Sequence, residues 1–283
     1  MLFDSHTHFN NEELTAEERA ELFAEMDEAV AAGKMAGAVD IGFDPASSET
    51  AAKHAEEHSW CYAAAGCHPH DAKIMDEEQL DIIRRLAGRD KVVAIGEIGL
   101  DFHYDLSDRD AQREWFRRQI RLANELKMPI SIHSREADQE VMDILKEEGA
   151  FSDERKSWFG ERPVPEGCDS RDARVLLHCF SGSAELAHQY IKLGATLSIA
   201  GPVTYKNNKK TVQVVQEVPA EFLLVETDAP YLTPVPLRGH RNRPVYVEHT
   251  ARRVAAIKGM TFEELAEITR RNAMRFYGID GIE

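Results

Sequence analysis

The sequence is poor in cysteine and has no long hydrophobic run, and both shortages narrow the class of protein. Its 283 residues include four cysteines, and none of them forms a CxxC pair. A chain of this length can bury a large core without disulfides, so we interpret the four as reduced structural thiols. No run of about 18 apolar residues occurs, which argues against a membrane-spanning helix.

The N-terminus lacks the features of a secretory signal. Its first ten residues, MLFDSHTHFN, contain no basic region followed by a long apolar stretch. We therefore expect a cytoplasmic protein without membrane association. The composition gives no signal for an oligomer or an obligate protein partner, so a monomer is the default expectation.

The sequence also has fewer basic than acidic residues. The chain has 34 Lys and Arg residues against 50 Asp and Glu residues, which gives a formal net charge of -16. Tight non-specific binding to long nucleic acid needs a basic surface and is therefore disfavoured. An enzyme that acts on a phosphate ester is not excluded, because metal ions and a few local cations can supply the positive charge.

Short apolar segments alternate with longer amphipathic ones. This alternation predicts parallel strands joined by right-handed helical crossovers, and eight such units predict an α/β protein with a closed (β/α)8 TIM barrel as one domain over residues 1–283. No GxGxxG follows the first segment, which argues against an open dinucleotide-binding sheet. The expected strands are 1–8, 37–43, 60–66, 91–97, 128–133, 173–179, 194–200 and 221–228.

Residues 149–173 are long, polar and rich in Gly, Pro and charge, so they predict an extended loop between the fifth and sixth strands. We expect this loop near the mouth of the barrel, where it could narrow or extend a substrate groove. The C-terminal segment predicts a helix that begins after Thr261, with Glu264 completing the cap and Gly278 following its end.

Metal-ligand side chains recur where the predicted strands end. The active site of such a barrel lies at the carboxyl ends of its strands, so these side chains should meet on one rim. No local rule places a histidine or a carboxylate at the end of so many strands. The residues are His6, His8, His68, His70, Glu97, His133, His178 and Asp228.

We predict two divalent metal ions at this rim. His6 and His8 share a face of their strand and suit one ion, with Asp228 as a further ligand that also accepts a proton from water. His133 and His178 suit the second ion, and Glu97 can bridge the two through its two oxygens. Mixed nitrogen and oxygen donors fit Zn, Mn, Co or Mg. Asp4 could orient one histidine, and Glu226 could support the site or only bond within the barrel.

Local positive charge points to a phosphate-containing substrate. Arg135 lies two residues after His133, and the segment 237–244 carries Arg238 with two further arginines. The planar guanidinium group suits phosphate oxygens. We predict that Arg135, Arg238, His68 and His103 contact the substrate phosphate.

These residues lie in motifs that resemble the TatD family of metal-dependent deoxyribonucleases, a branch of the amidohydrolase barrels. The matching stretches include FDSHTHFN, GCHPHDA, GEIGLDFHY, HCFSGS and ETDAPYL, and the likeness runs from residue 3 to residue 278. The resemblance implies that His6, His8, Glu97, His133, His178 and Asp228 bind metal, and that the substrate is DNA, cut as a 3′–5′ exonuclease or an endonuclease. The 149–173 segment is longer than this family leads us to expect.

Two alternatives keep the same residues. An amidohydrolase-type enzyme could use this site on an ester or amide, such as an aminoacyl ester, although many relatives with such chemistry use a carboxylated lysine where Glu97 stands. A barrel that binds metal without catalysis is the other alternative, and the intact set of ligand-type residues argues against it.

Overall fold

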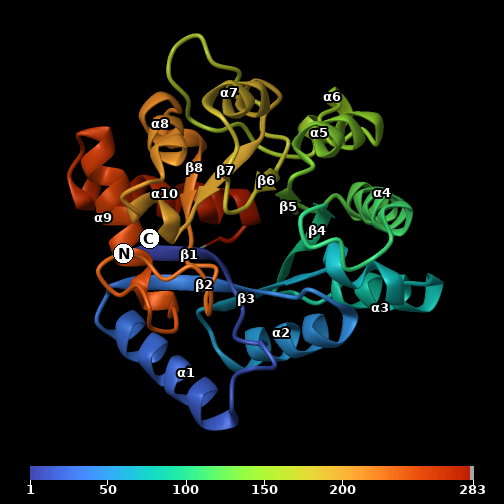
Figure 1. The fold of residues 1–283 in the computed structure, drawn as a ribbon, viewed down its shortest axis with the longest axis horizontal. Coiled ribbons are helices and arrows are strands. Elements are labelled where there is room, and N and C mark those ends of the chain that lie inside the picture. The colour runs from blue at the N-terminus through green and yellow to red at the C-terminus, as the bar shows by residue number, and fades with distance from the viewer. Residues whose placement is uncertain (281–283) are drawn as a thin grey trace.

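The computed structural model describes residues 1–280 and contains one sheet of eight parallel strands, hydrogen-bonded in chain order (Figure 1). Each strand overlaps the segment expected from the sequence. The strands are β1 (Leu2–Thr7), β2 (Met35–Ile41), β3 (Cys61–Ala65), β4 (Val92–Asp101), β5 (Ile130–Arg135), β6 (Val175–Leu177), β7 (Thr196–Ile199) and β8 (Leu223–Val225).

The first and last strands meet and nearly close the barrel. Thr7 and Ala229 form a parallel bridge, and the amide of His8 donates to the Ala229 carbonyl at 2.8 Å. The amide of Asp228 donates to the His6 carbonyl at 2.9 Å. The predicted (β/α)8 fold is therefore confirmed, and its closure brings together two parts of the chain that carry ligand-type residues.

Helices surround the strands, as Figure 1 shows. The predicted capping box of the last helix is present, with Thr261 and Glu264 exchanging hydrogen bonds and Gly278 in the left-handed conformation after its end. No helix within residues 1–280 is long and apolar enough to cross a membrane. The α-helices are α1 (Ala16–Ala31), α2 (Pro45–Glu57), α3 (Glu77–Leu86), α4 (Arg109–Leu126), α5 (Asp138–Glu147), α6 (Asp153–Ser157), α7 (Ala184–Lys192), α8 (Lys209–Glu217), α9 (Val247–Lys258) and α10 (Phe262–Tyr277).

Strand β4 is longer than predicted. It continues through Glu97 to Asp101, so Glu97 lies within the strand and not at its end. Its pairing with β5 shifts register between Ile95 and Ile98. Gly99 lies so close to β5 that a Cβ there would stand 1.9 Å from the His133 carbonyl oxygen, which only glycine permits. This close approach sets Glu97, Asp101 and His133 beside one another.

The 149–173 segment lies at the end of the barrel opposite the mouth. Its Arg155 donates to the carbonyls of Met128 and Ala173, which precede β5 and β6, both at 2.8 Å. Its Arg162 donates to the carbonyl of Gly194, which precedes β7, at 2.5 Å. The expectation that this segment shapes the mouth is wrong, because a connection that leads from a helix into a strand reaches that strand's amino end.

Candidate metal centre

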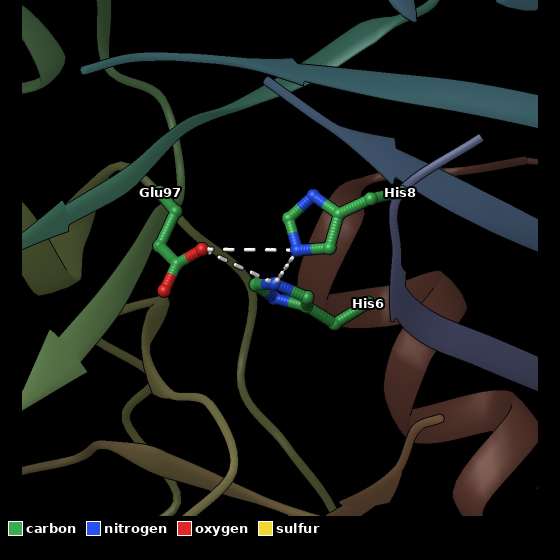
Figure 2. Close-up of side chains that lie close together, drawn as sticks. All are labelled: His6, His8 and Glu97. Atoms are coloured by element: carbon green, nitrogen blue, oxygen red, sulfur yellow. Dashed lines mark hydrogen bonds and ion pairs between the residues drawn. The ribbon is translucent and has the colours of Figure 1, made fainter. Parts of the chain in front are cut away.

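Four side chains converge from the carboxyl ends of β1 and β8 and from within β4. The Nε2 atoms of His6 and His8 lie 3.3 Å apart, and both face the Oε2 atom of Glu97, at 3.5 and 4.0 Å (Figure 2). The Oδ1 atom of Asp228 lies 3.4 Å from the Nε2 atom of His8 and 3.8 Å from that of His6. These atoms form the first group, and all belong to residues predicted to share one ion.

The other oxygen of Glu97 faces a second group. Its Oε1 atom lies 2.7 Å from the Nε2 atom of His178, 2.8 Å from the Nδ1 atom of His133 and 3.5 Å from the Nε2 atom of His68. The two oxygens of this one carboxylate therefore face two different sets of histidines. The sequence predicted this arrangement for Glu97, His133 and His178, and it placed His68 among the substrate contacts.

The chemistry of these donors fits divalent metal ions. The Nδ1 atom of His6 is buried without a hydrogen-bond partner among the described residues. Within residues 1–280, no lysine or arginine forms an ion pair with Glu97 or Asp228. Buried carboxylates need a compensating charge, and imidazole nitrogens with carboxylate oxygens are the ligands that zinc and similar ions prefer. A cation between these side chains would supply that charge.

Three of the histidines are oriented by a hydrogen bond from the nitrogen that faces away from Glu97. The Nδ1 atom of His8 donates to the Ile41 carbonyl at 2.9 Å, and the Nδ1 atom of His178 donates to Glu226 at 3.3 Å. The Nε2 atom of His133 bonds Asp101 at 3.2 Å. A proton held on one nitrogen leaves the other free to bind a metal ion. Glu226 therefore orients His178.

Asp4 does not orient either histidine of β1 as proposed from the sequence. Its carboxylate accepts from the amide and hydroxyl of Thr227 at 2.9 and 2.5 Å, and from the backbone amide of His6 at 3.3 Å. It therefore fixes the end of β1 against the chain that follows β8. The positions of His6 and Asp228 depend on this contact, because both residues lie within two positions of it.

Both carboxylates of the cluster are held in the ionised form. Burial would raise the pKa of Glu97, but the surrounding imidazoles of His178, His68 and His133 favour the charged carboxylate and hold the pKa well below its ordinary value. Burial would likewise raise the pKa of Asp228, and the neighbouring imidazoles of His8, His6 and His178 lower it. Ionised carboxylates are the form that binds metal ions.

Asp101 was missed by the sequence reasoning. It is fully buried, and its Oδ2 atom accepts from His133 at 3.2 Å and from His70 at 2.8 Å. Burial opposes ionisation of Asp101, but these hydrogen bonds and one from the Tyr104 amide hold its pKa below the ordinary value. Its position could have identified it, because Asp101 lies four residues after Glu97 in the same strand and therefore shares a face with it.

We expect Asp101→Asn to weaken metal binding at the second group by about 10- to 100-fold, because the carboxylate no longer fixes the ring of His133. Isothermal titration of the metal-free protein with Zn²⁺ or Mn²⁺ measures this change. Asp105→Asn is the matched control and should leave affinity unchanged, because Asp105 is an exposed carboxylate in the loop that follows β4 and pairs with Arg109. Equal affinities in both variants would remove Asp101 from the site.

The predicted substrate contacts His103 and Arg135 lie on the rim. Arg135 is exposed, and its guanidinium carbon lies 4.5 Å from the centre of the Tyr104 ring. Arg135 is the last residue of β5, two positions after His133 of the second group. His103 is exposed and bonds Glu136 at 2.7 Å, so the structure turns it toward that carboxylate.

The arginines of the segment 237–244 divide into two kinds. Arg241 and Arg243 pair with glutamates of α1 at 3.0 and 3.3 Å. Arg238 is exposed and lies over the ring of Tyr205 at 4.3 Å. Within residues 1–280, neither Arg238 nor Arg135 forms an ion pair with a carboxylate. The two cations that the sequence favoured for phosphate binding are therefore the two left available.

Buried histidines and carboxylates at the mouth of a (β/α)8 barrel fit a metal-dependent hydrolase. The chain belongs to the TatD related DNase family, whose family model matches residues 3–278. The resemblance seen in the sequence motifs is thereby confirmed.

Several relatives match over almost the whole chain. A protein of Bacillus subtilis described as "Uncharacterized metal-dependent hydrolase YabD" is 45% identical over 99% of this chain and 100% of its own. A "3'-5' ssDNA/RNA exonuclease TatD" of Pantoea ananatis is 33% identical over 86% of this chain and 88% of its own. The solved structure of YJJV, a TatD homologue of Escherichia coli, superposes with a TM-score of 0.83 at 24% identity, covering 99% of this chain and 98% of that one.

Proposed function

We propose that this protein hydrolyses phosphodiester bonds of DNA with two divalent metal ions, removing nucleotides from the 3′ end. The observation that carries the proposal is the position of Glu97, whose two oxygens face two separate groups of histidines. His6, His8 and Asp228 would hold one ion with Glu97, and His133 and His178 the other. Phosphodiester cleavage gains most from such a pair, because the attacking and the leaving oxygen both carry negative charge.

The residues of the chain have separate tasks in this reaction. Bound divalent ions supply Lewis acidity and lower the pKa of water. Asp228, ionised and facing His8 at 3.4 Å, is placed to accept a proton through its Oδ1 atom. Arg135 and Arg238 hold the phosphate groups of the strand by charge-assisted hydrogen bonds. His103 contributes only if it leaves Glu136, so we assign it a minor contact.

The 3′–5′ direction and the DNA substrate rest on relatives described as 3′–5′ ssDNA/RNA exonucleases, at about one-third identity. The ester or amide alternative has less support, because Glu97 and not a lysine stands between the two histidine groups. Single-stranded DNA labelled at either end tests the proposal. Mn²⁺-dependent loss of a 3′ label as mononucleotide, with the 5′ label retained on shortening strands, supports it. No cleavage of DNA or RNA by metal-loaded protein would refute it and favour an ester or amide substrate.

We expect Arg135→Gln and Arg238→Gln each to raise KM for single-stranded DNA about tenfold, with a smaller effect on kcat, because each removes a cation that contacts phosphate. The rise in KM should be smaller at high salt, since exposed charges are screened. Arg241→Gln is the matched control, because Arg241 pairs with Glu18. Steady-state kinetics with all three variants decides the matter, and an equal KM for all three would contradict the assignment.

A further inference from the structure

His68 lies in the second group of side chains but differs from its neighbours in hydrogen bonding. It precedes the short 3-10 helix η1 (Pro69–Ile74), and its Nδ1 atom accepts the backbone N–H of His70 at 3.1 Å. A backbone amide can only donate, so the Nδ1 atom of His68 must present a lone pair. The single proton of a neutral imidazole must then reside on its Nε2 atom.

This Nε2 atom faces the centre of the site. It lies 3.5 Å from the Oε1 atom of Glu97, the oxygen that His133 and His178 also contact. By proximity alone, His68, Glu97 and His133 form a set that could hold a metal ion. A nitrogen that carries a proton has no lone pair for a metal ion, so the short distances around His68 do not make it a metal ligand.

The three oriented histidines of the site all differ from His68 in the partner of their outer nitrogen. His8, His133 and His178 each direct their outer nitrogen at an oxygen, which must accept, so a neutral ring that keeps its proton there presents its inner nitrogen to a metal ion. His68 directs its outer nitrogen at a donor. The backbone around η1 therefore fixes the opposite tautomer at His68 alone among these four.

We propose that His68 is not a metal ligand and that its Nε2–H group donates a hydrogen bond to an oxygen of the substrate's phosphoryl group. This inference rests on the proposed function, because the phosphoryl group is the anion that a two-metal site would hold beside Glu97. A fixed donor in a buried site is most effective where negative charge develops during the reaction. His68 is 8% exposed, and the amide of His70 fixes its ring.

Two substitutions test separately the role of the inner nitrogen of His68, Nε2, and that of its outer nitrogen, Nδ1. His68→Asn keeps an acceptor for the His70 amide but is too short to reach the site, whereas His68→Gln reaches the site with an amide N–H. We expect His68→Asn to retain both ions and its Tm while kcat falls about 100- to 1000-fold, and His68→Gln to recover part of that loss. Loss of one ion from His68→Asn, measured by elemental analysis, would overturn the proposal.

A second measurement does not depend on catalysis. Nitrogen-15 NMR of histidine-labelled protein distinguishes the two tautomers, and the spectrum of His68→Asn assigns the signals of His68. We expect a protonated Nε2 atom both in the metal-free protein and after loading with Zn²⁺. A Nε2 atom that loses its proton on loading would overturn the proposal. If DNA is not cleaved but this atom stays protonated, the proposed function fails and the non-ligand assignment of His68 stands.

Discussion

Replacement of Glu97 by glutamine is expected to lower the turnover of DNA by about 1000-fold or more. The amide has the shape of the carboxylate but carries no charge, and its NH₂ group would face nitrogens that should bind metal. Ions in such sites supply several kcal/mol of transition-state stabilisation, and each 1.36 kcal/mol corresponds to a factor of ten. We also expect the number of bound ions to fall below two per chain, because both groups of histidines share this carboxylate.

The measurement combines single-turnover kinetics with metal analysis of the same sample. Glu217→Gln is the matched control, because Glu217 is an exposed carboxylate at the end of α8 that pairs with His188, outside the site. Glu97→Gln should remain folded, since the change removes a charge from a buried position. A variant that keeps two ions and normal turnover would show that Glu97 does not bridge the site.

Replacement of Arg162 by methionine is expected to destabilise the protein by about 3–5 kcal/mol, which is the cost of removing one partner of a buried ion pair. Arg162 and Asp172 are both fully buried, and their side chains meet at 2.5 Å. Burial lowers the pKa of Arg162 to about 10, so the group remains charged at neutral pH. The variant would leave Asp172 with the longer contact to Arg275, at 3.3 Å.

Urea denaturation of Arg162→Met measures this loss. Arg171→Met is the control, because Arg171 lies in the same segment but is exposed, and its ion pairs with Asp153 and Asp169 should contribute little. The folded Arg162→Met protein should keep its kcat, since the segment lies at the end of the barrel away from Glu97. A large loss of kcat without a loss of stability would place this segment in the catalytic site.

The barrel could be predicted because the same alternation of apolar and amphipathic segments repeats along the sequence. Eight apolar segments with helical segments between them allow few other topologies, and the cap formed by Thr261 and Glu264 is a local feature. The length of β4 could not be predicted, because it depends on how closely Gly99 approaches His133 of the next strand. The 149–173 segment was predicted at the wrong end of the barrel because the prediction relied on its length and polarity. Its topology, a connection from α5 into β6, places it at the amino end of β6.

The candidate site was predictable to the extent that position along a strand determines it. His6, His8, His133, His178 and Asp228 follow from strand ends alone, and the structure brings them together around Glu97. Partners distant in sequence were not predictable. Asp101 bonds His133, 32 residues away, and the arginines at 241 and 243 meet glutamates of α1 more than 200 residues away. The tautomer of each histidine depends on such partners.

The most direct test of a two-metal site bridged by Glu97 is a titration of metal-free protein with Mn²⁺ in which bound ions per chain and release of nucleotides from 3′-labelled single-stranded DNA are followed together. We expect no release without metal and full activity only once two ions are bound, with Glu97→Gln inactive throughout. Nucleotide release from fully chelated protein, or full activity with one ion, would contradict a two-metal site bridged by Glu97.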